Sequence, residues 1–170
     1  MEFNKVIKKR FATRSFKSDL VSDKLITNIL EVCRCAPTAK NQQPQKVFVV
    51  KSPEGISKID EISPCRYNAP VVLLVCSDKS VAWSNGDYST YEMDATIYAT
   101  HLILAATDLG LNSVWVEMFD KAKAKELFEL SENIEPICLI PIGYKNDDYN
   151  PSPLHFSRKE LKEYVEYKYE

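Results

Sequence analysis

Residues 91–117, YEMDATIYATHLILAATDLGLNSVWVE, decide the fold of this 170-residue chain. Small and apolar side chains recur in the first part at the spacing of one helix face, and Gly110 follows as a C-terminal cap. These positions are Ala95, Ala99, Leu102, Ile103, Ala106 and Leu109. We therefore expect one long helix over residues 91–109, whose alanines let another backbone approach closely, and a strand over residues 112–117.

Three more helices are expected, each with its own start signal. Residues 22–35 carry an apolar face, Ser22 or the aspartate after it can cap the first turn, and Pro37 stops the helix. A Ser-Pro-Glu sequence at residues 52–54 starts a second helix. Asp120 caps a third, which reaches about residue 130. Helices and strands are thus interleaved along the chain.

The strands are expected in segments rich in β-branched and apolar residues. Residues 46–51 and 136–144 fit this pattern, and residues 70–76, PVVLLVC, are apolar on both faces, as in a central strand. Near the end, SRKE at residues 157–160 has the form of a capping box that opens a brief helix. Residues 165–170 then alternate Val or Tyr with charged residues, which predicts a strand with one solvent-exposed face, added to this sheet or to a partner's.

Composition favours one domain over residues 1–170, because 45% hydrophobic and 27% charged residues are typical of a globular chain of this length. A formal charge of -2 gives no reason to expect nucleic acid or an anionic membrane as a partner. The N-terminus has no apolar signal region, and the longest apolar run, residues 69–76, is too short to span a bilayer. We therefore expect a cytoplasmic protein.

The sequence lacks the common patterns of metal and catalytic sites. Cys33 and Cys35 lack the usual C-x-x-C spacing and a second ligand pair, so packing near a helix end is the favoured interpretation. His101 and His155 have no cysteine or acidic neighbours at metal-ligand spacing, so we expect no metal. No G-x-G-x-x-G or Walker loop is present. An enzyme with this sequence would take its chemistry from a cofactor.

Three polar segments could bind such a cofactor. RFATRSF at residues 10–16 places Arg10 and Arg14 four residues apart, and two guanidinium groups can hold a phosphate; the alternative is a solvated basic helix end. APTAKNQQPQ at residues 36–45 carries amide side chains between two prolines, which suits a ligand with paired donors and acceptors but also suits an ordinary loop. VWVEMFD at residues 114–120 brings backbone amides to the end of a strand.

Together and in this order, the segments resemble the FMN-dependent nitroreductase family over nearly the whole chain. The matching pieces are the basic R-x-A-x-R stretch, the APTAKNQQP loop, the long helix with its Asp-Ala pair, the strand ending in Trp-Val-Glu, and the PIGY strand before a basic tail. The resemblance implies an α+β fold: a mixed, mainly antiparallel four-stranded sheet flanked by helices, with a fifth strand from the C-terminal tail of a partner subunit. It also implies a homodimer with two FMN sites, each lined by both chains.

The resemblance assigns cofactor contacts residue by residue. Arg10 contacts the FMN phosphate, Arg158 returns to the phosphate from the tail, and Arg14 lies near the pyrimidine edge, where a cation stabilises the charge of the reduced ring. The backbone of Glu117 and Met118 faces flavin N5, and no protein acid or base is obligatory. The other implied contacts are Phe11, Ala12, Pro37, Thr38, Ala39, Asn41, Gln43, Trp115 and Val116, with the loop of residues 37–43 reaching the flavin of the other subunit.

Two departures from the family pattern bear on these contacts. Ala12 stands where serine is frequent, so a hydroxyl contact is lost, and Met118 stands where glycine is common, which narrows the space near N5. A further contact is expected within residues 62–68, without a named residue.

The implied activity is transfer of hydride from NADH or NADPH through flavin N5 to a small organic acceptor, such as a nitroaromatic or a quinone. Two alternatives remain open at this stage: another flavin chemistry on the same scaffold, such as enone reduction or dehalogenation, and a non-catalytic flavin-binding or redox-sensing protein. The physiological acceptor and the choice between NADH and NADPH are not readable from the sequence.

Overall fold

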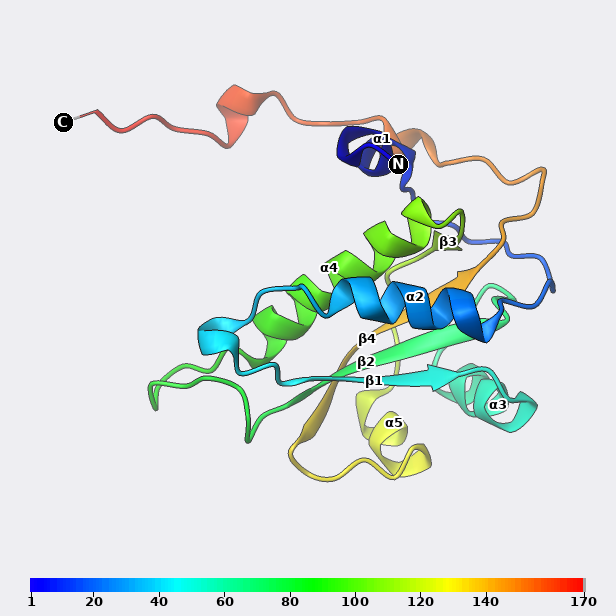
Figure 1. The fold of residues 1–170 in the computed structure, drawn as a ribbon, viewed down its shortest axis with the longest axis horizontal. Helices are drawn as coiled ribbons and strands as arrows, with labels where there is room; N and C mark the ends of the chain where they lie inside the picture. The colour runs from blue at the N-terminus through cyan, green and yellow to red at the C-terminus, as the bar shows by residue number, and fades with distance from the viewer. Residues whose placement is uncertain (170) are drawn as a thin grey trace.

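A four-stranded sheet with strand order β1-β2-β4-β3 separates two layers of helices in the computed structural model, which describes residues 1–169 (Figure 1). The strands are β1 (Gln45–Val50), β2 (Val71–Asp78), β3 (Asn112–Ser113) and β4 (Ile134–Gly143). All three ladders are antiparallel, and a single parallel bridge joins Ala12 to Ser113. The expected four-stranded, mainly antiparallel sheet flanked by helices is confirmed. The fifth strand from a partner stays a prediction.

Strand β2 lies in the middle of the sheet because both of its faces are apolar. Val71, Leu73 and Val75 face the core formed with helices α2 (Asp23–Cys33) and α4 (Tyr91–Asp108). Val72 and Leu74 face the opposite core, formed with helices α3 (Pro53–Ile62) and α5 (Lys121–Leu127). The alternation of side chains along a strand thus divides one apolar segment between two cores.

Helix α4 ends where the sequence predicts. The N–H of Leu111 donates to the carbonyl of Ala106 at 2.9 Å, and Gly110 has φ +86°, a conformation that suits glycine at a helix C-terminus. Ala95 and Ala99 are fully buried in the core shared with α2 and the sheet, as expected for small side chains at a close approach.

The third strand is shorter than the predicted residues 112–117. Val116 still pairs with Leu139 through two backbone hydrogen bonds of 2.9 and 3.0 Å, but only as an isolated bridge. Between bridge and strand, the N–H of Val114 donates to the carbonyl of Pro141 at 3.3 Å, and Pro141 has no N–H with which to return the bond. The proline therefore interrupts the ladder.

For the C-terminal region, the expected position of the capping box is wrong, and the expected terminal strand is not formed on this chain's own sheet. The capping box lies at Glu160 and Glu163, around the short 3-10 helix η3 (Leu161–Glu163), and not at residues 157–160. Residues 165–169 form no strand within this chain, and residue 170 lies outside the described residues. The side chain of Glu163 accepts from the N–H of Glu160 at 2.8 Å, so the glutamate three residues further on sets the helix start.

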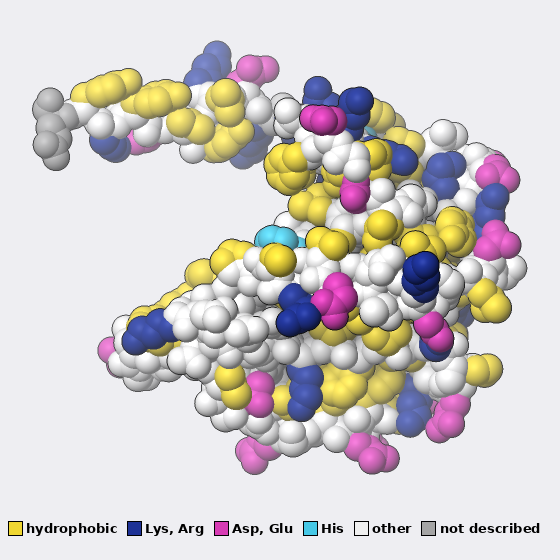
Figure 2. Space-filling view, viewed as in Figure 1, with side chains coloured by type: hydrophobic (Ala, Val, Ile, Leu, Met, Phe, Trp, Pro, Cys, Tyr) yellow, Lys and Arg dark blue, Asp and Glu magenta, His cyan; other side chains and the backbone are white. Residues whose placement is uncertain are grey.

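The N-terminal residues and the first part of the C-terminal segment, around residues 155–158, lie side by side at one end of α4. The N-terminal amino group, just before helix α1 (Phe3–Lys9), pairs with Asp108 in the last turn of α4. The C-terminal segment passes α1 and extends away from the body of the molecule (Figures 1 and 2). Its large apolar side chains are exposed: Leu154, Phe156, Leu161, Tyr164, Val165, Tyr167 and Tyr169. None of the helices in residues 1–169 has both the length and the apolar character needed to cross a bilayer.

Candidate functional site

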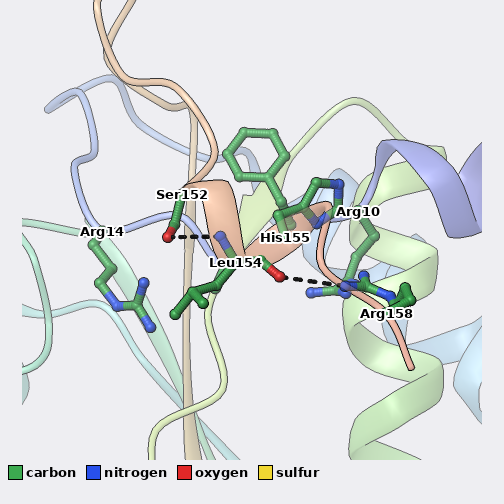
Figure 3. Close-up of a pocket in the computed structure, with 8 residues that line it drawn as sticks. Arg10, Arg14, Ser152, Leu154, His155 and Arg158 are labelled. Atoms are coloured by element: carbon green, nitrogen blue, oxygen red, sulfur yellow. Dashed lines mark hydrogen bonds between the residues drawn. The ribbon is translucent and has the colours of Figure 1, made fainter. Parts of the chain in front are cut away.

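Three arginines from opposite ends of the chain line one cleft of about 240 Å³, here called the arginine cleft (Figure 3). Arg10 and Arg14 come from the segment after α1, and Arg158 comes from the C-terminal segment. The other lining residues are Phe11, Ala12, Ser152, Leu154 and His155. The cleft thus contains Arg10, Phe11, Ala12, Arg14 and Arg158 from the sequence-predicted site, while sequence reasoning missed the three residues 152, 154 and 155.

The segment after α1 presents its arginines because it is extended. The N–H of Arg10 donates to the carbonyl of Val6 at 2.9 Å and so caps the end of α1. The backbone of Arg10 itself is extended. Three residues on, the N–H of Thr13 donates to the carbonyl of Ser113 at 3.0 Å, which ties the segment to β3. Thr13 is fully buried, so its neighbours on the opposite side of the extended chain, including Arg14, are turned toward the cleft.

The C-terminal segment is held against residues 10–14 by aromatic and hydrogen-bond contacts. The hydroxyl of Tyr149 donates to the carbonyl of Ala12 at 3.2 Å, and its ring lies parallel to that of Phe11. The ring of His155 meets that of Phe11 edge-on, with ring centroids 6.0 Å apart. These contacts bring the segment that carries Arg158 across the mouth of the cleft.

A short helix in this segment then sets the position of Arg158. Ser152 caps the 3-10 helix η2 (Pro153–His155) by accepting from the N–H of Leu154 at 3.3 Å. Arg158 donates back to the carbonyls of Leu154 and Ser157, at 3.3 and 2.6 Å. Only backbone carbonyls meet this guanidinium group among the described residues, so its positive charge is not neutralised.

The electrostatics of the cleft favour an anion. Within residues 1–169, no carboxylate forms an ion pair with Arg10, Arg14 or Arg158, although ten other ion pairs are present. Burial of the guanidinium group and the nearby charge of Arg158 lower the pKa of Arg10. Several arginines without acidic partners suit a group of multiple negative charge, such as a phosphate, which each guanidinium can bind with two hydrogen bonds.

Tyr67 lies next to Arg14, within residues 62–68, the segment in which a further contact stays a prediction. A hydrogen bond to Cys65 and burial raise the pKa of Tyr67, and the neighbouring Arg14 partly opposes that rise. Both Tyr67 and Asn68 have left-handed backbones, with φ of 54° and 63°. Such a conformation is uncommon outside glycine and is often found at binding sites. Asparagine is enriched in this conformation, but the sequence does not indicate it for Tyr67.

Residues 37–43, here called the amide loop, lie away from the arginine cleft. The loop contains the 3-10 helix η1 (Ala39–Asn41) and meets the first turns of α4, while α1 lies at the last turn of the same helix (Figure 1). Three of its residues, Lys40, Asn41 and Gln43, have φ between 50° and 56°. One chain therefore does not bring Pro37, Thr38, Ala39, Asn41 and Gln43 to the three arginines.

The junction between β3 and α5 offers free backbone donors. Among the described residues, the N–H groups of Glu117 and Met118 donate to no acceptor, whereas the carbonyl of Met118 accepts from Ser63 at 2.7 Å. The indole N–H of Trp115 donates to the side chain of Glu117 at 2.9 Å. Val116 uses both backbone groups on Leu139, so its N–H is not free to donate to a ligand. No group of three or more metal-ligating side chains is found within residues 1–169.

Comparisons with known proteins place this fold. The model of the nitroreductase family matches residues 7–66 and 62–144. A protein of Methanothermobacter thermautotrophicus, with the provisional name NADH dehydrogenase/NAD(P)H nitroreductase, is 30% identical over 93% of this chain and 88% of its own. The FMN reductase [NAD(P)H] of Bacillus subtilis is 30% identical over 79% of this chain and 62% of its own.

Solved structures agree. A nitroreductase family protein of Clostridium difficile is 35% identical, with a TM-score of 0.91 over 99% of both chains. A protein from Exiguobacterium sibiricum, provisionally named a nitroreductase and solved in complex with FMN, is 18% identical, and its TM-score of 0.87 over 99% of this chain and 98% of its own shows the same fold. The family match over most of the chain confirms the resemblance seen in the sequence: this chain belongs to the nitroreductase family.

Proposed function

We propose that this chain binds FMN and passes reducing equivalents from NADH or NADPH to a small organic acceptor, such as a nitroaromatic or a quinone. Relatives named as NAD(P)H nitroreductase and FMN reductase, and a structural neighbour in complex with FMN, bear out the expectation of an NAD(P)H-dependent flavin enzyme. The proposal goes beyond the names of these relatives by specifying the acceptor.

The arginine cleft is the observation that carries the proposal. FMN ends in a phosphate, and the cleft presents Arg10 and Arg158 without any carboxylate to neutralise them among the described residues. Holding like charges together costs free energy, which a bound dianion would offset. The donor set therefore fits the phosphate. Phe11 and Ala12 complete the wall, and Ala12 contributes no hydroxyl.

Arg14 and the free N–H groups of Glu117 and Met118 are proposed to serve the ring of FMN. When bound, FMN supplies a ring that accepts hydride at N5 and delivers it to the acceptor. A fixed cation at Arg14 stabilises negative charge on the pyrimidine edge, and a backbone N–H can donate to N5. Trp115 fixes the Glu117 side chain by its hydrogen bond, and Val116 contributes only packing. No side-chain acid or base is required.

The amide loop is proposed to reach the FMN held by the arginines of a second subunit. Pro37, Thr38, Ala39, Asn41 and Gln43 lie at the start of α4, and α1 lies at its end. An 18-residue helix is about 27 Å long. In a homodimer, the amide loop of one subunit would lie beside the arginines of the other subunit. The exposed apolar side chains of the C-terminal segment would then be covered. A fifth strand formed by residues 165–169 on the partner's sheet belongs to the same proposal.

Two further expectations are retained as part of the proposal. A single domain over residues 1–170 is supported by two cores that share one sheet, with residue 170 outside the described part. A cytoplasmic location is the other, and it rests on the sequence alone.

The test is a spectrum followed by a titration. Protein purified and reconstituted with FMN should show a bound flavin spectrum that bleaches with NADH or NADPH under anaerobic conditions and returns when a nitroaromatic or quinone is added. Steady-state assays with enones and halogenated acceptors in the same panel separate the alternative flavin chemistries. Protein that binds no FMN would refute the proposal, and protein that binds FMN but is reduced by neither nicotinamide would be a flavin-binding protein without this activity.

A further inference from the structure

Asp94 carries a carboxylate in the first turns of α4, and the residue is buried, with only 2% of its surface exposed. It forms no ion pair within residues 1–169. A buried carboxylate is costly unless hydrogen bonds or a favourable field compensate it. Here the N-terminal end of α4 supplies part of that field, because the helix dipole is positive there. A residue kept at such a cost needs an explanation.

Two hydrogen bonds complete the environment of Asp94. Its Oδ1 accepts from the backbone N–H of Ala39 at 2.9 Å, and its Oδ2 accepts from the hydroxyl of Thr90 at 2.8 Å. Thr90 is itself buried and its N–H donates to the carbonyl of Trp83 at 3.0 Å. Oδ2 of the carboxylate is therefore fixed by Thr90 at the start of α4, and Oδ1 holds the amide loop through Ala39.

The bond from Ala39 to Asp94 is the only hydrogen bond between the amide loop and any other part of residues 1–169. The remaining hydrogen bonds of residues 37–43 stay inside the loop, such as the one from the N–H of Gln43 to the hydroxyl of Thr38 at 3.0 Å. The next two residues after Ala39 are Lys40 and Asn41, both with left-handed backbones. Left-handed conformations in residues other than glycine persist where surrounding contacts hold them.

We infer that Asp94 is a positioning residue of the FMN site: it holds the amide loop of its own subunit in the conformation that contacts the FMN bound by the arginines of the other subunit. This inference rests on the proposed function. Asp94 touches neither cofactor nor substrate and acts through Ala39 and the residues that follow it.

The first experiment compares two substitutions at this position. Asp94→Ala removes both hydrogen bonds, and we expect the dissociation constant for FMN to rise roughly 10- to 100-fold, the size of a lost hydrogen bond to a charged group. Asp94→Asn keeps an oxygen that accepts from Ala39 and an amide that can donate to Thr90, so it should retain most of the affinity. Rescue by the asparagine variant is a result that mere loss of a charge would not give.

A second variant tests the same bond from the loop. Ala39→Pro removes the N–H that Asp94 accepts and leaves α4 unchanged. We expect the backbone to accept the proline, because Ala39 opens a 3-10 helix and Thr38 before it is extended, with φ −135° and ψ 157°. We expect a loss of FMN affinity like that of Asp94→Ala. Asp87→Ala, which removes an exposed carboxylate of the preceding loop, is the matched control and should bind FMN like the unmodified protein.

Mixed dimers test the action across subunits. Asp94→Ala chains keep their arginines and Arg10→Ala chains keep their amide loop, so a dimer of one chain of each kind contains one intact composite site and one doubly impaired site. Purified through two different affinity tags, this mixed dimer should bind about half the FMN of the unmodified dimer under conditions where both parent dimers bind little.

The outcomes separate this inference from the proposed function. Unmodified protein without FMN affinity would overturn the proposed function. Unmodified protein that binds FMN, together with Asp94→Ala and Ala39→Pro variants that bind it equally well, would overturn the role of Asp94. Mixed dimers that bind no more FMN than the parent variants would overturn the action across subunits. Thermal unfolding of each variant shows whether the fold persists, and the Ala39→Pro variant decides the question if the alanine variant at position 94 does not fold.

Discussion

Arg158 lies beside Arg10 in the arginine cleft, although the two residues stand near opposite ends of the chain. Burial of the guanidinium group and the charge of Arg158 both lower the pKa of Arg10. The chain thus keeps two like charges together, with no acidic residue of the described chain paired to them. Such an arrangement favours binding of an anionic ligand at the expense of the stability of the free protein.

Replacing Arg158 should therefore have opposite effects on stability and on binding. For Arg158→Met we expect the free energy of unfolding without ligand to stay equal or rise by up to about 0.5 kcal/mol, because repulsion is relieved. The dissociation constant for FMN should rise roughly tenfold, since a charge-assisted hydrogen bond is lost. Urea unfolding with and without FMN measures both, with the exposed neighbour Lys159→Met as control. Unchanged FMN affinity in Arg158→Met would contradict the assignment.

The five cysteines should differ sharply in reactivity. All five are free, and Cys35 is the exposed one. Burial raises the pKa of Cys33 and of Cys76 to about 12, and it raises that of Cys138 as well, so these thiols stay protonated at pH 8. A thiol-reactive dye should label one cysteine per chain rapidly in the native protein and five after denaturation. In Cys35→Ser the rapid reaction should disappear, and a rapid phase that survives would point to an accessible core thiol.

Glu135 should contribute to stability only above its own titration range. Burial alone would raise its pKa, but the hydrogen bond from Lys125 and the charges of Lys125 and Lys79 outweigh burial and hold the pKa below its usual 4.5. A depressed pKa means that the contribution is present above 4.5 and is lost as the pH falls through the folded-state value.

The corresponding variant is Glu135→Gln. At neutral pH we expect it to lose up to about 1 kcal/mol of unfolding free energy, the upper range for a partly exposed pair. Its difference from the unmodified protein should shrink as the pH falls below 4.5. Urea unfolding as a function of pH measures this, and Glu132→Gln, which lies outside any ion pair of the described residues, is the control. A difference that grows toward acid pH would show that the sign is wrong.

Leu102 should be a main contributor to the core between α4 and the sheet, because it is fully buried there. Leu102→Ala is expected to cost about 2–5 kcal/mol of unfolding free energy, the usual range for a buried leucine. Leu20 is 88% exposed, so Leu20→Ala should change little. Denaturant midpoints for the two variants provide the measurement. Equal losses would mean that Leu20 is covered in the assembled protein.

The sequence predicts elements well where local signals and burial agree. Helix α4 follows its apolar spacing to the glycine cap, and β2 follows an apolar run that only a doubly covered strand can bury. The third strand was overestimated because Val114 and Val116 are good strand residues, while the obstacle, Pro141, lies on a different strand. Register across strands is not visible in either segment alone.

The arginines of the candidate site could be predicted from the sequence, but the contacts that hold the site residues in place could not. Two arginines in an extended basic segment are visible in the sequence, whereas their approach by Arg158 depends on a ring contact between Phe11 and Tyr149. The left-handed backbone of Tyr67 depends on tertiary contacts and has no compositional signal. Asp94 stood out only as half of an Asp-Ala pair, because its partner, a backbone N–H, has no side-chain identity to read.

The central position of β2 also has a kinetic consequence. Its first neighbour, β1, precedes it in the chain, but its second neighbour, β4, begins only at Ile134. During synthesis on the ribosome, one edge of the run Val71–Asp78 therefore stays open until most of the chain has emerged. An apolar strand with an open edge is prone to self-association, and pairing between distant segments is slow. We therefore expect efficient folding in the cell to require shielding of this strand until β4 has been synthesised.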